Sequence, residues 1–251
     1  MKKREPLLTE PFFDETISYT SSSIERFLAP LRSEYDKIAK PEIFLFAVFN
    51  KQYSLLSLKY SRGYPTEDLK PDLLATLQAL EAYKQHPAAE DFFFNGEQDE
   101  YMQAVSLLSL ALLLRVDPDV FRRLVEAIGL RGQDYMLEWL AGRRLPHRPP
   151  TTQLLFPKTY ARLRDAIQAP AAAQPQLLKL FLSHWYESVD TVWYNIHAHR
   201  QDAAGFTGYW CWEAAAVAWA LNLDDSELRD LRYYPKDLAD YAYGRQTTPT
   251  P

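Results

Sequence analysis

The chain has 251 residues, of which 47% are hydrophobic and 14% aromatic, so it can fill a large core and is not a disordered protein. Its formal net charge of -5 argues against a protein that binds nucleic acid by neutralising phosphates, and it favours a basic partner. A single cysteine, Cys211, excludes an intramolecular disulfide, and we expect its thiol to be buried.

The N-terminal sequence MKKREPLLTE has basic residues but lacks the apolar stretch of about 7 to 15 residues that completes a signal peptide. The most apolar segments, residues 43–49 and 104–116, are shorter than the roughly 20 residues that a membrane crossing needs. We therefore expect a cytoplasmic protein without a membrane partner, in which both segments are buried helices.

Apolar residues recur every three or four positions along most of the chain, glycine is scarce and prolines mark the turns. This pattern predicts an all-α protein, a bundle-like architecture of about nine to ten helices with little or no sheet. In the first half, Pro30 is expected to kink or divide the first helix, and Asp117 to cap the fifth. The helices expected there cover residues 21–39, 42–60, 73–83, 98–116, 118–129 and 134–141.

Residues 142–157 are rich in proline and arginine, and they form the predicted linker. It would separate an N-terminal helical domain, residues 1–141, from a C-terminal helical domain, residues 158–251. The helices expected in the second domain cover residues 158–168, 177–199 and 208–223, followed by a short one after Asp225 and a last one after Pro235.

The segment GYWCWEAAAVAWALNL, residues 208–223, is apolar on nearly every side, which is typical of a helix at the centre of a bundle. Glu213 is its one acid. Because a buried carboxylate must be hydrogen-bonded, paired or protonated, we interpret Glu213 as an internal structural acid.

Three histidines raise the hypothesis of a metal site. His197 and His199 lie two positions apart, so on a persisting helix they point about 200 degrees away from each other and cannot face one ion. The chain also lacks an HExxH motif, a GxSxG elbow and a phosphate-binding loop. We predict no catalytic residue, no metal and no cofactor; an all-α metal-dependent hydrolase that uses His184, His197 and Glu213 remains the alternative.

Charge is unevenly distributed along the chain. Residues 90–100 contain five acids and no base, residues 213–240 contain seven acids and three bases, and residues 143–164 contain six bases and no acid. Such runs are usually solvated surface, but acids beside aromatic residues can also dock a basic partner. The predicted partner contacts are Glu97, Asp99, Glu100, Asp224, Asp225 and Glu227.

The motif GYWxxExAA at residues 208–216, the pair Asp224 and Asp225, and the motif YYPxDL at residues 233–238 together resemble the C-terminal domain of PoNi immunity proteins. The stretch LLSLKYSRGYPTEDLKPDL, residues 55–73, is similar to the N-terminal domain of that family. The residues that match the signature, which we interpret as structural, are Tyr209, Trp210, Glu213, Tyr234, Pro235 and Asp237.

PoNi proteins are the antitoxins of PoNe-type DNase effectors in interbacterial competition, type VI secretion included. The resemblance therefore implies an all-α, non-enzymatic, cytoplasmic protein that neutralises its toxin by stoichiometric occlusion. It leaves open whether the protein forms a homo-oligomer. A helical scaffold whose partner is not a toxin is the second alternative.

Overall fold

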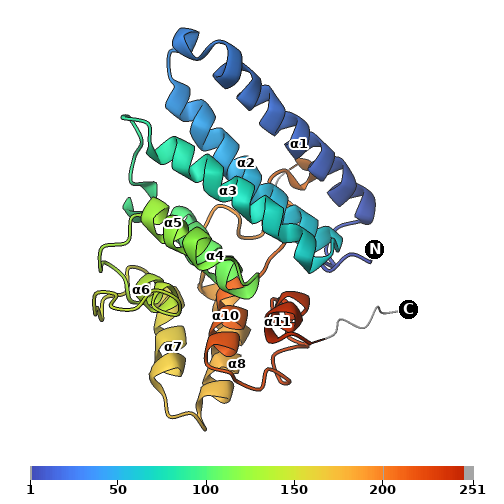
Figure 1. Cartoon of the computed structure of the whole chain (residues 1–251). Coiled ribbons are helices and arrows are strands. Elements are labelled where there is room, and N and C mark those ends of the chain that lie inside the picture. Colours follow the sequence, from blue (N-terminus) through green and yellow to red (C-terminus); the bar gives the residue numbers. More distant parts are fainter. Residues whose placement is uncertain (1, 200, 246–251) are drawn as a thin grey trace. The chain divides into compact units, whose positions relative to one another are not determined.

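The computed structural model describes residues 2–199 and 201–245 (Figure 1). This part of the chain contains eleven α-helices and no strand, which confirms the predicted all-α class. None of these helices combines the length and the apolar character that a membrane crossing requires. The chain divides into two compact units, Met1–Glu90 with Gln201–Gly208 (unit 1) and Asp91–Arg200 with Tyr209–Pro251 (unit 2).

Unit 1 is built on three consecutive helices, α1 (Glu10–Ser33), α2 (Pro41–Arg62) and α3 (Leu69–Lys84), and α2 packs against the other two (Figure 1). α1 begins at Glu10 rather than at residue 21, because the Thr9 hydroxyl accepts a hydrogen bond from the Phe12 N–H and caps the helix. Pro30 lies inside α1, close to its C-terminal end.

A segment from much later in the chain, residues 201–208, completes unit 1. Phe206 is buried, with its ring centroid 6.3 Å from those of Phe12 and Phe13. The Ser61 hydroxyl donates a hydrogen bond to the Thr207 carbonyl at 2.6 Å. These contacts fix the segment against α1 and α2.

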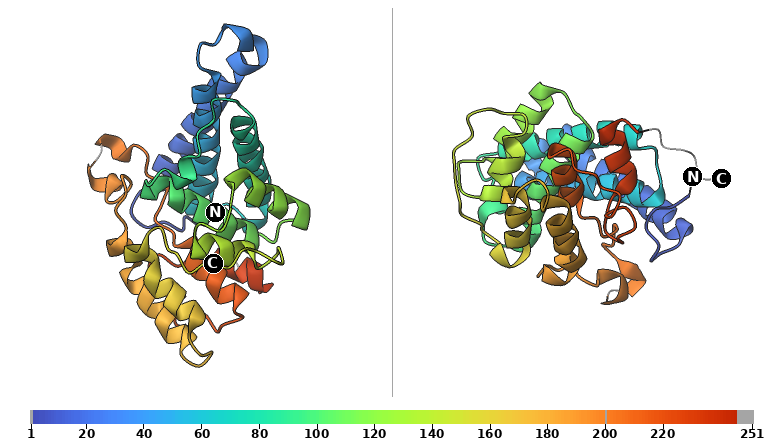
Figure 2. Two further views of the ribbon diagram at one scale, coloured as in Figure 1. Left: turned by 90° about the vertical axis from the view of Figure 1, so that its left-hand side faces the viewer. Right: turned by 90° about the horizontal axis from the view of Figure 1, so that it is seen from below.

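Unit 2 is arranged around α4 (Gln98–Leu113), which is buried along nearly its whole length. α7 (Pro157–Gln168) and α8 (Gln174–Ser188) lie side by side as a helical hairpin (Figure 2), and the short α9 (Ile196–His199) follows. The other helices of this unit, all in contact with α4, are α5 (Pro118–Ile128), α6 (Tyr135–Ala141), α10 (Trp212–Ala220) and α11 (Lys236–Tyr243).

Three predictions about helices in unit 2 are wrong. The helix expected over residues 177–199 is interrupted: α8 ends at Ser188, and the β-branched and aspartate residues that follow favour a turn over a helix. The tryptophan–alanine helix begins at Trp212 instead of residue 208. Turns, and no helix, follow Asp225.

The predicted linker, residues 142–157, lies within unit 2 and packs on the start of α6. The Tyr135 N–H donates to the Gln153 carbonyl at 2.7 Å, and the Leu155 N–H donates to Asp134 Oδ2 at 2.9 Å. The compact units divide at residues 90 and 91, whereas the division into sequence domains at 142–157 rests on composition and stays a prediction.

Candidate partner-binding surface

The first predicted acid cluster lies at the N-terminal end of α4. Glu97 occupies the N-cap position and is exposed, and Asp99 and Glu100 follow in the first turn. The positive end of the helix macrodipole favours carboxylates there. The three acids therefore lie together at the start of the helix, where Glu97 is exposed and Asp99 and Glu100 are half-buried.

Asp99 differs from its neighbours because it has a structural partner. Its Oδ2 accepts a hydrogen bond from the Val192 N–H at 3.1 Å. Burial raises the pKa of Asp99, and the nearby charges of Glu100, Glu97 and Asp190 raise it further. This group of four carboxylates is thus close enough for mutual repulsion. Within the described residues, no base forms an ion pair with any of them.

The loop after α8, residues 189–195, brings apolar side chains to the same place. Val192 is 72% exposed and Tyr194 is 38% exposed. Tyr186 anchors the loop: its ring stacks on Tyr194 at 4.7 Å between centroids, and its hydroxyl is 2.9 Å from Asn195 Oδ1. We call Glu97, Asp99, Glu100, Asp190, Val192 and Tyr194 the acidic surface.

A hollow of about 440 Å³ adjoins the acidic surface, and Glu97, Asp190 and Phe156 are among its lining residues. Gln98 also lines the hollow: its Nε2 donates to the Thr159 hydroxyl at 2.7 Å, and its Oε1 accepts from the Asp190 N–H at 3.0 Å. Lys158 lines the hollow as well, so the hollow presents charges of both signs beside the ring of Phe156.

Asp190, Val192 and Tyr194 were not among the predicted contacts, because the sequence predicts one continuous helix over residues 177–199. The signal was nonetheless present. The stretch Val189–Asp190–Thr191 combines two β-branched residues with an aspartate, all of which are poor helix formers.

The second predicted cluster follows α10 and is divided by burial. Asp224 is exposed, and its Oδ1 accepts from the Ser226 N–H at 3.0 Å, which lowers the pKa of Asp224. Glu227 is exposed and pairs with Lys179 at 2.8 Å. Asp225 is only 1% exposed.

The burial of Asp225 does not fit its predicted role as a partner contact. Its Oδ1 lies 2.6 Å from Arg245 Nη1, and its Oδ2 accepts from the Tyr234 hydroxyl at 2.9 Å. Arg229 joins the same network through a bidentate pair with Asp240, at 2.7 Å for each bond. Asp225 is therefore an internal anchor of the C-terminal turns, and we leave it out of the candidate surface.

Five of the six signature residues are buried inside unit 2, and their structural role stays an interpretation. Glu213 is 1% exposed, and its Oε1 accepts hydrogen bonds from Trp185 Nε1 at 2.8 Å and the Tyr160 hydroxyl at 3.3 Å. Burial raises the pKa of Glu213. Cys211 is a buried free thiol, as expected. The other signature residues are Tyr209, Trp210, Tyr234 and Pro235, all buried, and Asp237, which is partly exposed.

The structure does not bring the three residues of the hydrolase alternative into one site. His184 is exposed, with Nδ1 2.9 Å from the Leu180 carbonyl, whereas Glu213 is enclosed by Trp185 and Tyr160. His197 Nδ1 is 2.8 Å from the Tyr209 hydroxyl. Among the residues that the structure describes, no group of three or more His, Cys, Asp or Glu side chains could hold a metal ion.

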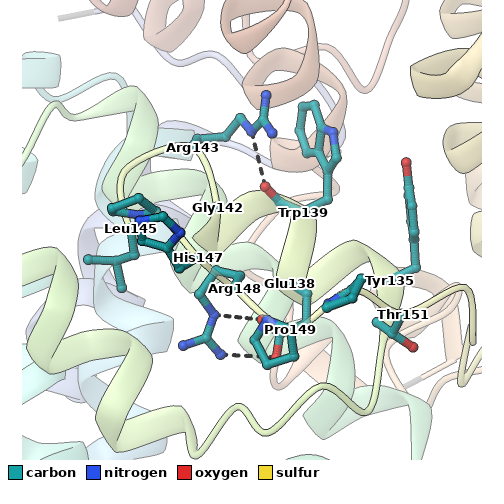
Figure 3. Close-up of a pocket in the computed structure, with 12 residues that line it drawn as sticks. Tyr135, Glu138, Trp139, Gly142, Arg143, Leu145, His147, Arg148, Pro149 and Thr151 are labelled. Carbon is teal, nitrogen blue, oxygen red and sulfur yellow. Dashed lines mark hydrogen bonds and ion pairs between the residues drawn. The ribbon is translucent and has the colours of Figure 1, made fainter.

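The basic stretch around the predicted linker borders a hollow of about 290 Å³ beside α6 (Figure 3). Arg148 points at Glu138, with Nε 2.6 Å from Oε2 and Nη2 3.0 Å from Oε1. The Arg143 guanidinium lies over the Trp139 ring, 4.3 Å from its centroid, and Nε donates to the Trp139 carbonyl. Part of this positive charge is thus used to hold the loop after α6.

Comparisons with known proteins match both parts of the chain. Residues 4–126 match the family described as PoNe immunity protein (PoNi), N-terminal, and residues 132–238 match PoNe immunity proteins (PoNi), C-terminal. The crystal structure of protein PA2201 from Pseudomonas aeruginosa has the same fold, with a TM-score of 0.75 over 97% of this chain and 91% of that chain. Its sequence identity of 18% supports a likeness of fold alone. Among curated proteins, none matches this chain.

Proposed function

The chain belongs to the PoNe immunity protein (PoNi) family, and on this premise we propose that it neutralises a cognate toxin by binding it in a stoichiometric complex. Membership of an immunity protein family implies a toxin partner and a role without catalysis. We propose further that the toxin is a DNase of the PoNe type, and that binding takes place in the cytoplasm of the producing cell.

The observation that carries this proposal is the acidic surface. Three carboxylates near the start of α4 form no ion pair within the described residues, and they lie beside the exposed Val192 and Tyr194. They belong to Glu97, Glu100 and Asp190. A DNase must present a basic groove to the phosphates of its substrate. Carboxylates that occupy the positions of phosphates would exclude DNA without any chemical step, while the apolar side chains would supply buried area.

The acids of the surface have different roles in this proposal. Glu97, Glu100 and Asp190 contact the toxin, and Asp99 holds the loop that presents Val192. A stable interface covers about 800 Å² on each partner, more than one helix end provides. Asp224 and Glu227, both exposed after α10, remain candidates for further contacts with the toxin.

The test uses the full chain and the toxin domain encoded by the gene beside its own. The wild-type protein is expected to abolish DNA cleavage at an equimolar ratio. The double variant Glu97→Lys/Glu100→Lys should associate about 10- to 100-fold more slowly at low salt, and added salt should reduce this difference. Association and dissociation rates are measured by surface plasmon resonance.

The matched control is Glu34→Lys/Asp36→Lys, which makes the same change in charge at exposed acids of unit 1. Its association rate should stay close to that of the wild type. Equal rates for the two double variants would contradict the acidic surface as the contact. Cleavage that persists in excess wild-type protein would contradict inhibition itself, and the absence of a toxin gene beside this gene would favour the scaffold alternative.

A further inference from the structure

Unit 1 contains a groove of about 390 Å³ between α1, α2 and the segment 201–208. Phe12, Thr16 and Tyr19 recur at helical spacing on the face of α1 that lines it. Leu58 of α2 and Phe206 line the groove near Phe12 and make this end apolar. We call it the α1–α2 groove.

The other end of the α1–α2 groove is marked by an exposed aromatic ring between two cations. Tyr19 is 62% exposed, the largest exposed side chain of the groove, and Arg26 lies over its ring at 5.5 Å from the centroid. Lys51 Nζ approaches the same ring at 5.7 Å. The buried Ser23 accepts a hydrogen bond from Arg26 Nη2 at 2.7 Å and fixes the guanidinium in place.

These two cations have no internal counterion. In the part of the chain that the structure describes, neither Arg26 nor Lys51 forms an ion pair with a carboxylate. Two acids, Glu15 and Asp202, also line the groove, whereas Arg26 lies outside the lining and adjoins it only where it covers the Tyr19 ring. The groove therefore has an apolar end at Phe12, cations at the Tyr19 ring and two further acids in its lining, and such uneven charge favours one orientation of a ligand.

The wall formed by residues 201–208 has a specific backbone shape. Asp202 and Ala203 adopt left-handed conformations, with φ of 53 and 51 degrees. Such a conformation is strained for an alanine and persists only where the surroundings enforce it. Here the buried Phe206 and the bond from Ser61 to Thr207 hold the segment against the helices.

We propose that the α1–α2 groove binds an extended segment of a partner protein, in which an apolar side chain is followed about three residues later by a carboxylate. Phe12 and Tyr19 are seven residues apart on α1, and a rise of 1.5 Å per residue separates them by about 10 Å along the helix. An extended peptide covers that distance in about three residues. The apolar side chain contacts Phe12, and the carboxylate meets Lys51 at the Tyr19 ring, where Arg26 is the next cation.

Nucleic acid fits the α1–α2 groove less well than such a peptide. Glu15 and Asp202 would repel a continuous phosphate backbone, and the chain as a whole carries a net charge of -5. The proposal concerns unit 1 alone and does not depend on the toxin or on the acidic surface of unit 2. It can therefore fail or hold independently of the proposed function.

The test selects short random peptides, displayed on phage, for binding to the full chain. We expect the selected peptides to share an apolar residue and, about three positions on, Asp or Glu. In titrations with a fluorescent copy of the most frequent peptide, Lys51→Glu and Tyr19→Ala should each weaken binding by about tenfold or more. A second selection on Lys51→Glu should replace the acid by Lys or Arg.

The matched control is Lys37→Glu, an identical change at an exposed lysine that does not line the groove. It should leave the affinity for the peptide within about twofold of the wild type. Thermal melting checks that all variants are folded. Selected peptides without a shared acid, binding that survives Lys51→Glu, or Lys51-dependent binding of a fluorescent single-stranded DNA instead of peptides would each overturn the proposal.

Discussion

Asp99 accepts a hydrogen bond from the backbone N–H of Val192 at 3.1 Å, so an acid in the first turn of α4 holds the loop after α8. This bond explains why the exposed Val192 lies beside the free carboxylates of Glu97 and Glu100. It also separates two roles within one run of acids. Asp99 supports the surface from within, while its neighbours face outward.

Replacing Asp99 tests this role. Asp99→Asn keeps an oxygen acceptor and removes a charge that burial disfavours, so its melting temperature at neutral pH should equal or exceed that of the wild type. Asp99→Ala removes the acceptor and should lower the free energy of unfolding by about 0.5–1.5 kcal/mol. Hydrogen exchange at the Val192 amide should accelerate in the alanine variant, and unchanged protection there would contradict the role.

Asp99→Asn should also change how the stability of the protein depends on pH. Because the folded-state pKa of Asp99 is raised, its favourable contribution to stability is complete below the unfolded-state pKa and is lost as pH rises through the folded-state pKa. Asp99→Asn has no such titration. The difference in melting temperature between this variant and the wild type should therefore grow in favour of the variant as pH rises.

Glu213 is the second acid whose role can be isolated. Glu213→Gln retains Oε1 as the acceptor for Trp185 and Tyr160, and should preserve the fold. Glu213→Ala leaves both donors buried without a partner, and should cost about 2–5 kcal/mol of unfolding free energy. Urea denaturation gives both values. Equal stability of the two variants would mean that the hydrogen bonds contribute little.

Burial also makes Glu213 sensitive to pH. It raises the folded-state pKa, so the stability that this group contributes is present below its unfolded-state pKa and is lost as pH rises through the folded-state value. Glu213→Gln should flatten the dependence of unfolding free energy on pH over that window. If the unfolding free energy of Glu213→Gln changes with pH as steeply as that of the wild type, other groups cause the pH dependence.

The elements that the sequence predicts well are those whose signals are local. α5 begins one residue after Asp117, as predicted, although the Asp117 side chain makes no capping hydrogen bond. α6 covers almost all of the expected 134–141 and is capped by Asp134, because caps and apolar periodicity act within a few residues. The interior position of Glu213 followed from a helix that is apolar on all sides. In each case the decisive neighbours lie within the same helix.

Non-local contacts explain what the sequence could not predict. Asp224 and Asp225 are identical in type and adjacent, yet one is exposed and the other is buried by Tyr234 and Arg245. Likewise, nothing local indicates that residues 201–208 complete unit 1, because Phe206 is fixed by rings of α1. Contacts between residues distant in the sequence therefore bury Asp225, which removes it from the candidate surface. Contacts of the same kind form the α1–α2 groove.

Arg229 is expected to be essential for the C-terminal turns of unit 2. Arg229→Met removes the bidentate pair with Asp240 and leaves Arg245, at 3.4 Å, as the cation that still faces that carboxylate. Breaking a buried pair costs about 3–5 kcal/mol, and the 31% exposure of Arg229 places the expected loss at the lower end.

The matched control for Arg229→Met is Lys179→Met. It breaks the exposed pair with Glu227, whose side chain is 66% exposed, and should cost less than about 1 kcal/mol. Urea denaturation of both variants, followed by tryptophan fluorescence, measures the difference. Similar losses would show that the Arg229 network is no stronger than a surface pair.

Gly63 and Gly244 both end helices in the left-handed conformation, with φ of 103 and 70 degrees, but they differ in the space around them. A Cβ at Gly63 would collide with the backbone carbonyl of Lys2, whereas nothing lies within 4 Å of one at Gly244. Gly244→Ala should therefore cost only the conformational strain of about 1–2 kcal/mol. Gly63→Ala should cost more, because it also displaces the N-terminal segment, in which Arg4 donates to the Tyr60 and Tyr64 carbonyls at 2.8 Å.

Differential scanning calorimetry compares the melting temperatures of the two glycine variants. Trypsin should cleave near Lys3 faster in Gly63→Ala alone. Equal melting temperatures and equal cleavage rates would show that the N-terminal segment does not pack on the end of α2.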